Sequence, residues 1–267
     1  MEGTSGISSF SQVKGNTKDF DVYRRIWTQD INMLIEGAVA GGADEILVNE
    51  GHDGMNYIYP DQLHPKARLI EGRLKSKNQM HGVDGGYDVA FILCHARAGQ
   101  QGVLSHSFIA PDIWEMRLNG EPIGEIGLNV LMASHFDVPV GLIVGDDAAC
   151  AEAAELVPEI NSVATKECIT QFTANCFSRE VVSSRLRDEA EKTVKEIEKF
   201  SLHKVKGPYT LDVVFTIPAM TELISYIPGV KVTSPRSVSY TCDDYLELTK
   251  VRILIVNLSR MIGDQLR

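Results

Sequence analysis

The sequence lacks the features that mark several large classes of protein. Its 267 residues include 26 basic and 36 acidic side chains, which gives a formal net charge of −10. A nucleic-acid-binding protein needs a basic surface to neutralise phosphates, so this charge argues against a nucleic-acid partner. No apolar run approaches the roughly 18 residues of a membrane span, and no basic and then apolar signal segment opens the chain. We therefore expect no membrane partner either.

Cysteine pairs are also absent. The chain has five cysteines, an odd number, and none of them forms a CxxC motif: Cys94, Cys150, Cys168, Cys176 and Cys242. This pattern excludes a disulfide framework and a cysteine-rich structural zinc site. Most of these cysteines have the surroundings of small buried hydrophobic residues. Without a secretion signal, the chain is expected to belong to the reducing cytoplasm.

The residues that are present favour a globular α/β protein. Hydrophobic residues make up 44% and charged residues 23% of the chain, which is ordinary for a globular domain. Short apolar runs alternate with helical patterns over the first 160 residues. Strands are predicted at 45–49, 89–94 and 138–144, and helices at 19–41, 123–136 and 146–158, the last with an aspartate cap. This alternation predicts a parallel sheet flanked by helices.

The pattern changes after about residue 160. A long charged helix is predicted over 178–202, followed by strands at 209–217 and 230–242 and a capped helix over 243–262. These elements predict a second, smaller α+β portion. We therefore expect two domains, an α/β domain over 1–160 that carries the functional residues and an α+β domain over 161–267.

Two histidines follow predicted strands. His52 comes just after the strand at 45–49, and His95 directly follows the strand at 89–94. Ligands of open parallel sheets bind beyond the carboxyl ends of the strands. One histidine in such a place is more often a hydrogen-bonded structural residue, but two of them with acidic residues nearby favour metal binding.

Glu125 is the acidic residue that best fits such a site. It lies in GEIGLN, between glycines and apolar residues, so it is not easily explained as a solvated charge. Glu121 is better explained as a favourable negative charge in a first helical turn. Imidazole together with carboxylate is the ligand mixture of zinc in hydrolytic sites. The remaining histidines are assigned structural or surface roles: His64, His81, His135 and His203.

The first six residues, MEGTSG, have two interpretations. They have the composition of a loop after a strand, with a carboxylate and then glycines among small residues, but no strand precedes them. One interpretation is a frayed, glycine-rich terminus. The other is a functional loop, in which case the natural protein begins earlier than Met1.

Five motifs resemble those of one known enzyme family. In chain order they are MEGTSG, VNEGHDGMN, LCHARA, GVLSHSF and GEPIGEIGLN. They resemble the zinc D-aminopeptidases of the DppA type, and the likeness extends through VGDDAACAEAAEL and LVPEI over nearly the whole chain. Each motif alone is weak evidence, but five in one order at matching spacing are strong evidence.

The resemblance implies a two-domain α/β fold and a ring-stacked homodecamer that admits only small peptides. It implies two zinc ions per subunit and an activity that removes N-terminal D-residues from short peptides such as D-Ala-D-Ala. Matched motif by motif, the implied metal ligands are Glu2, His52, His95 and Glu125, with Glu2 as the bridging carboxylate. The implied catalytic residue is His106, which would transfer a proton or stabilise the oxyanion.

One departure from the family concerns the start of the chain. The family motif is Asp-x-Glu-Gly, in which the aspartate is also a metal ligand, and this sequence starts at the x, Met1. If the motif is complete in the natural protein, we expect an apolar strand ending in aspartate ahead of Met1. If it is not, one of the two zinc sites lacks a ligand.

Two other functions stay open from the sequence. A metal-dependent amidase acting on γ-glutamyl or diaminopimelate-containing wall fragments would use the same metal centre with a different pocket. A metal-stabilised oligomer would bind dipeptides without cleaving them.

Overall fold

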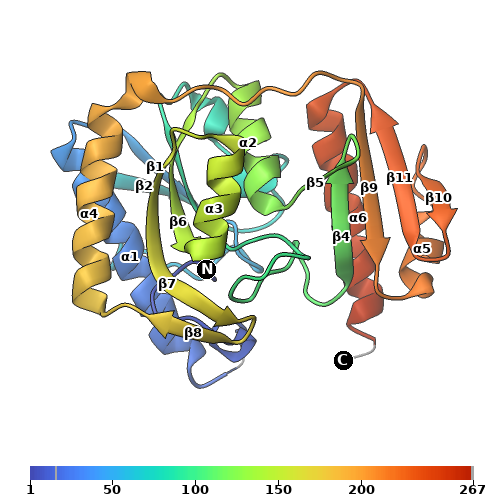
Figure 1. The fold of residues 1–267 in the computed structure, drawn as a ribbon, viewed down its shortest axis with the longest axis horizontal. Helices are drawn as coiled ribbons and strands as arrows, with labels where there is room; N and C mark the ends of the chain where they lie inside the picture. The colour runs from blue at the N-terminus through green and yellow to red at the C-terminus, as the bar shows by residue number, and fades with distance from the viewer. Residues whose placement is uncertain (16, 266–267) are drawn as a thin grey trace.

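The computed structural model describes residues 1–15 and 17–265. Their helices and strands form two lobes that lie side by side in Figure 1. The larger lobe contains a sheet of order β3-β6-β7-β8 and a separate parallel pair of β1 and β2. These strands are β1 (Ile46–Asn49), β2 (Ala67–Ile70), β3 (Ala90–Leu93), β6 (Val140–Asp146), β7 (Asn161–Thr170) and β8 (Thr173–Cys176).

β6 is the central strand of the larger lobe and is buried along its whole length. It pairs in parallel with β3 and with β7. Leu142 and Val144 pack in a cluster with α1 (Phe20–Ala40) and α4 (Arg179–Lys195), whereas Ile143 packs in the cluster that contains α2 (Glu125–His135) and α3 (Asp147–Leu156). Helices therefore cover both faces of the sheet, which confirms the predicted α/β class.

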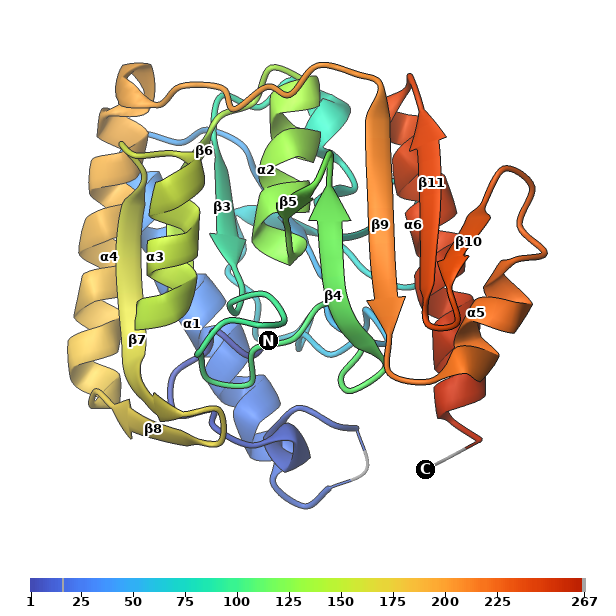
Figure 2. The ribbon, with the colours of Figure 1, turned by 45° about the vertical axis from the view of Figure 1, so that its right-hand side comes forward.

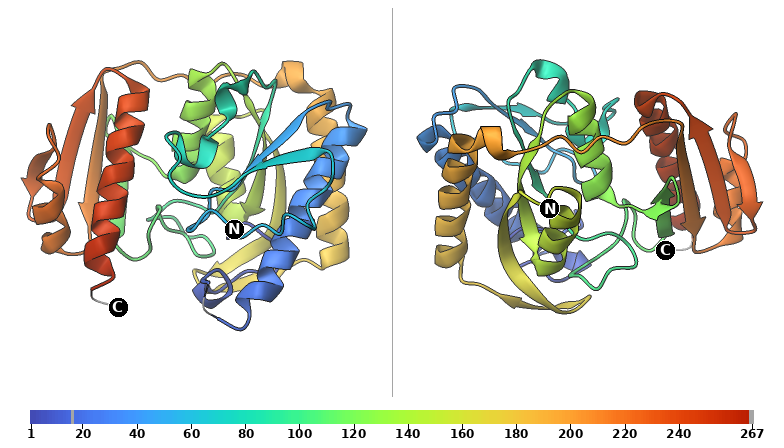
Figure 3. Two further views of the ribbon diagram at one scale, coloured as in Figure 1. Left: turned by 180° about the vertical axis from the view of Figure 1, so that it is seen from behind. Right: turned by 45° about the horizontal axis from the view of Figure 1, so that its top comes forward.

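The smaller lobe is an antiparallel sheet of order β10-β11-β9-β4-β5. Figure 2 shows its strands beside the larger lobe, and Figure 3 shows α6 on the sheet face that is turned toward that lobe. Its elements are β4 (Ile113–Leu118), β5 (Glu121–Pro122), β9 (Tyr209–Phe215), α5 (Pro218–Ile224), β10 (Lys231–Ser234), β11 (Ser237–Cys242) and α6 (Tyr245–Gly263).

The two predicted helix caps are present. The side chain of Asp146 accepts a hydrogen bond of 2.9 Å from the backbone N–H of Ala149 at the start of α3. Asp244 accepts one of 2.9 Å from Leu246 at the start of α6. Each bond satisfies an N–H group that has no partner within its helix.

The chain passes between the lobes more than once. β4 and β5 lie between β3 and α2 in sequence, yet they pair within the smaller lobe, where β4 is bonded to β9. β7, β8 and α4 come later in sequence but belong to the larger lobe. The sheets thus do not divide at residue 160, and the assignment of 1–160 and 161–267 as separate domains stays a prediction.

A cavity of about 830 Å³ lies between β1 and β3. Within the described part of the chain, β1 pairs only with β2 and β3 only with β6, so each strand has one open edge. Every residue of both strands lines the cavity, which extends from the apolar side of α1 to the carboxyl ends of the strands and on to α6. None of the described helices is long and apolar enough to cross a membrane.

Candidate metal centre

The first residues of the chain form a buried loop. Met1 to Ser5 are all buried. Lys166 on β7 donates from Nζ to the carbonyl of Glu2 at 2.5 Å and to that of Thr4 at 2.9 Å. Burial lowers the pKa of Lys166 to about 8. The interpretation of MEGTSG as a frayed terminus is therefore wrong, because this loop is held by a buried lysine.

Gly3 allows this loop to lie against the sheet. A Cβ atom on Gly3 would lie 2.5 Å from the carbonyl oxygen of Cys94 and 2.8 Å from that of Val144. The hydroxyl of Thr165 donates to the carbonyl of Gly3 at 2.8 Å. Only a residue without a side chain fits at this position, and the close approach places Glu2 beside the end of β3.

The structure brings together the five residues that the sequence singles out. The Nδ1 atom of His52 lies 3.4 Å from Oε2 of Glu2, and Nε2 of His95 lies 3.3 Å from Oε1 of Glu125. The ring of His106 stacks on that of His95, with centroids 3.9 Å apart and planes inclined by 14°.

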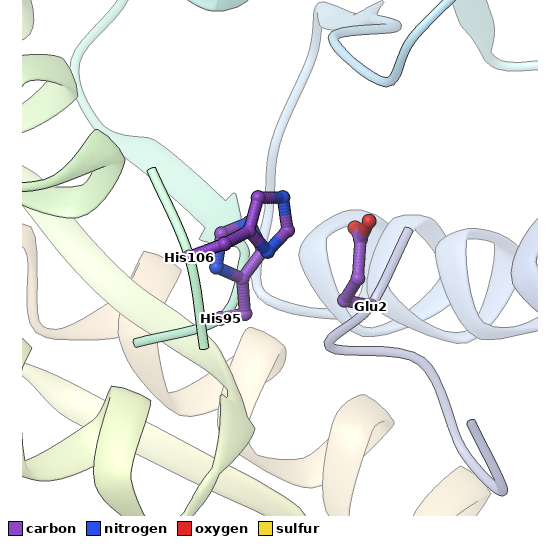
Figure 4. A group of neighbouring side chains, drawn as sticks. All are labelled: Glu2, His95 and His106. Atoms are coloured by element: carbon purple, nitrogen blue, oxygen red, sulfur yellow. The ribbon is translucent and has the colours of Figure 1, made fainter. Parts of the chain in front are cut away.

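The side chains that could hold a metal ion come from separate segments of the chain. Glu2, His95 and His106 offer ligand atoms that all lie within 4.8 Å of one another, and Figure 4 shows these three side chains together. Cys94, His95 and Glu125 form a second such group. Burial raises the pKa of the Cys94 thiol well above its usual value, so this sulfur is protonated. Cys94 is thus a poor ligand, and the side chains left from the two groups are Glu2, His95, His106 and Glu125.

Hydrogen bonds fix the orientation of all three imidazoles. His52 bonds through Nε2 to the carbonyl of Val13 at 3.0 Å, and His95 through Nδ1 to that of Ala96 at 3.0 Å. His106 bonds through Nδ1 to the carbonyl of Leu104 at 2.6 Å. A carbonyl accepts but does not donate, so each bonded nitrogen carries a proton, and the other nitrogen is the one that can bind a metal ion. This is how histidines are oriented when they bind metals.

In His52 and His95 this second nitrogen faces a carboxylate, at 3.4 Å and 3.3 Å. Such a contact is favourable when a proton or a metal cation lies between the nitrogen and the carboxylate oxygen. Two ligand atoms bound at about 2.1 Å to a tetrahedral zinc ion are about 3.4 Å apart. The observed separations of 3.4 Å and 3.3 Å match that value. The donor set therefore fits zinc.

The charges of the site are strongly coupled. Burial alone would raise the pKa of Glu125, but His95 outweighs it and lowers the pKa to about 2. Burial alone would lower the pKa of His95, but Glu125 raises it to about 9. In the same way, His52 holds the pKa of Glu2 well below its usual value against the effect of burial. Both carboxylates are thus ionised and able to bind a cation.

Comparisons with known proteins show the family of this chain. The family model described as D-aminopeptidase matches residues 1–253. A D-aminopeptidase of Bacillus subtilis (strain 168) is 31% identical over 261 residues, which is 97% of this chain and 95% of the relative. The chain belongs to the D-aminopeptidase family. It is thus related to metallo-aminopeptidases, and the resemblance stated from the motifs is confirmed.

A solved D-aminopeptidase structure has the same fold. It is described as the Zn-dependent D-aminopeptidase DppA from Bacillus subtilis, a self-compartmentalizing protease. The two structures superpose with a TM-score of 0.94 at 30% sequence identity, covering 97% of this chain and 95% of the other. The α/β fold seen here is therefore the fold of this D-aminopeptidase.

The sequence does not predict the groups that hold Glu125 in the present protein. Oε1 of Glu125 accepts a hydrogen bond of 2.6 Å from the backbone N–H of Phe108. Its Oε2 accepts one from Nε2 of Gln79, whose own Oε1 accepts from Asn129 at 2.9 Å. Glu125 also begins α2, where the helix dipole favours a negative charge. Gln79 lies in a short 3-10 turn without a motif, so nothing in the sequence marks it.

Replacing Gln79 with leucine is expected to weaken zinc binding by about 10–100-fold, the usual effect of losing a group that orients a metal ligand. The leucine would leave the Oε2 oxygen of Glu125 and the side-chain amide of Asn129 without their present partner. Competition with a zinc-binding dye measures the affinity. Gln62→Leu is the matched control, because Gln62 is exposed and its side chain has no role at this site. Equal affinities for the two variants would contradict the role given to Gln79.

Proposed function

We propose that this protein is a zinc-dependent aminopeptidase that removes N-terminal D-residues from short peptides such as D-Ala-D-Ala. The observation that carries the proposal is the set of three imidazoles, His52, His95 and His106, each held by a backbone carbonyl, that line one cavity with Glu2 and Glu125. Family membership supports the D-aminopeptidase activity. The Zn-dependence of the relative supports the choice of metal.

Two zinc ions per subunit are proposed, with Glu2 between them. Glu2 contacts His52 on one side and belongs to the group with His95 and His106 on the other, which suits a bridging carboxylate. We propose His52, His95, Glu125 and Glu2 as the ligands. When zinc is bound, it polarises the scissile carbonyl and lowers the pKa of water from 15.7 to about 7.

His106 is proposed as the catalytic residue. Its Nδ1 is held by Leu104, so its Nε2 is the nitrogen that faces a bound peptide and exchanges a proton with it. The stacking on His95 and the edge contact with Phe10, whose ring centroid is 5.6 Å away, fix the plane of the imidazole. A ring in a fixed plane is a precondition for directional proton transfer.

Chelation is expected to abolish hydrolysis of D-Ala-D-Ala, and added zinc is expected to restore it, because chelation removes the cation that would polarise the peptide carbonyl and acidify the water. Release of D-alanine measures the rate, and L-Ala-L-Ala is the matched control substrate. Equal hydrolysis of both peptides would argue for an amidase of other specificity. Zinc binding without hydrolysis of either peptide would argue for a dipeptide-binding protein.

A homo-oligomer, with ten subunits by resemblance, is proposed as the working form. The related structure is described as self-compartmentalizing, and this chain exposes large apolar side chains at Trp114 and Phe172. In sedimentation velocity we expect a stable species of about ten times the chain mass of 29.5 kDa. A stable monomer at micromolar concentration would contradict this.

A cytoplasmic location is proposed as well. All five cysteines are free, which agrees with a cytoplasmic location.

A further inference from the structure

Two arginines line the same cavity as the metal centre. Arg73 lies in the loop after β2, and Arg260 lies near the end of α6, so they come from different lobes. About 38% of the Arg73 side chain and 35% of the Arg260 side chain are exposed. A ligand in the cavity can therefore reach both guanidinium groups.

Asp53 joins the two arginines. Oδ1 of Asp53 lies 2.5 Å from Nη1 of Arg260 and 3.3 Å from Nη2 of Arg73, and Nε of Arg73 donates to the Asp53 carbonyl at 2.7 Å. The hydroxyl of Tyr57 donates to the other oxygen of Asp53 at 2.9 Å. The carboxylate of Asp264 lies 3.9 Å from Arg260 and is mostly exposed. A guanidinium has five N–H donors, so these contacts leave donors on both arginines for a ligand.

The location suits a short peptide. Asp53 directly follows His52, a proposed metal ligand, so the two arginines that Asp53 joins lie beside the loop that carries this ligand. Two extended residues span about 7 Å, which is the distance from the amino end of a dipeptide to its carboxylate. Arginine binds carboxylates with paired N–H donors, which a lysine does not offer.

We propose that Arg73 and Arg260 bind the C-terminal carboxylate of a short peptide whose first residue lies at the metal centre. This inference rests on the proposed peptidase function. It predicts that the enzyme prefers peptides of two or three residues, whose free C-terminal carboxylate can reach the arginines. Longer peptides would place a peptide bond, not a carboxylate, opposite the arginines. Asp53 is a positioning residue in this subsite, because it orients both guanidinium groups.

The alternative is that the Arg260 ion pair only holds α6 against the loop of His52. A comparison of ligands separates the two roles. A structural pair affects the binding of a free-acid peptide and of its C-terminal amide equally, whereas a carboxylate subsite affects only the free acid. Combining the change in the ligand with the change in the protein isolates the contact itself.

The experiment measures KM for D-Ala-D-Ala and for D-Ala-D-Ala amide on the zinc-loaded enzyme and on Arg260→Gln, Arg73→Gln and Arg260→Lys. For the wild type we expect the amide to have a KM about 10–100-fold higher than the acid, the usual effect of losing hydrogen bonds to a charged group. In Arg260→Gln the acid should lose this advantage while the amide is unchanged. Arg260→Lys should restore part of it.

Arg25→Gln is the matched control, because Arg25 forms an exposed ion pair with Asp21 at 2.9 Å outside the cavity. It should keep the wild-type ratio of acid to amide. Equal KM values for acid and amide in the wild type would overturn the inference, as would an equal rise for both ligands in Arg260→Gln.

A second measurement separates failure of this inference from failure of the proposed function. Reduced-amide analogues of both peptides, with CH2–NH in place of the scissile CO–NH, cannot be hydrolysed and are titrated by calorimetry. If the enzyme hydrolyses no peptide but Arg260→Gln selectively weakens the acid analogue by about 10–100-fold, the function is wrong and the subsite stands. If peptides are hydrolysed but both analogues bind alike, the subsite is wrong and the function stands.

Discussion

Replacing His106 with alanine is expected to lower kcat by about 10²–10⁴-fold, the range for losing a general acid or base, while zinc content stays near that of the wild type. The physical reason is that the Nδ1 atom of His106 is held by Leu104, and its Nε2 is the nitrogen assigned to the substrate. His95→Ala should instead lose metal, because His95 contacts Glu125 at 3.3 Å and removal opens the ligand set. Elemental analysis and steady-state kinetics on both variants measure the two effects.

The control for this pair of variants is His135→Ala, because His135 is exposed at the end of α2. It should leave both zinc content and kcat unchanged. His106 also lies within ligand distance of Glu2 and His95. If His106→Ala loses zinc as completely as His95→Ala, then His106 is a ligand and the assignment of roles is wrong. Full activity of His106→Ala would mean that it is only a loop residue.

Gly3→Ala is expected to reduce kcat/KM by at least about 10²-fold, because a displacement of about 1 Å at a catalytic site has an effect of this size. The added Cβ would lie 2.5 Å from the carbonyl oxygen of Cys94, which follows β3, and 2.8 Å from that of Val144 in β6. Neither strand can move easily, since β6 is buried throughout. The loop must therefore shift and carry Glu2 with it. Kinetics with saturating zinc and a crystal structure of the variant test this.

Gly15→Ala is the matched control for Gly3→Ala. A Cβ atom on Gly15 would meet its nearest neighbours, the side chains of Phe20 and Tyr57, at an ordinary 3.8 Å. We expect this variant to keep wild-type kcat/KM. Wild-type activity in Gly3→Ala would show that the loop is more compliant than its contacts with Cys94, Val144 and Thr165 indicate.

The elements predicted correctly are those that local patterns specify. The strand at 138–144 is a continuous apolar run because β6 is covered on both faces. His95 could be placed at the edge of the sheet because the apolar run that forms β3 ends just before it. These features depend on neighbours in sequence, and a single sequence is enough to find them.

What could not be predicted depends on distant partners. β4 buries Ile113, Met116 and Leu118 and has a shift of register between Ile113 and Glu115, yet nothing local shows that it pairs with β9 almost a hundred residues later. Lysine is usually an exposed residue, and the burial of Lys166 is explained by its hydrogen bonds to the carbonyls of Glu2 and Thr4. The family resemblance placed the five site residues in one site, but the tautomer of each imidazole required the backbone around it.

Because β4 and β5 belong to the smaller lobe but lie within the sequence of the larger lobe, the protein cannot be divided into its lobes by a single cut of the chain. A fragment ending at residue 160 would leave β4 without β9 and β6 without β7, so two unpaired strand edges would favour aggregation. A chimera that exchanges the smaller lobe between relatives must transfer two separate segments, 113–122 and 209–263. These two segments fold into one sheet although 86 residues separate them in the chain.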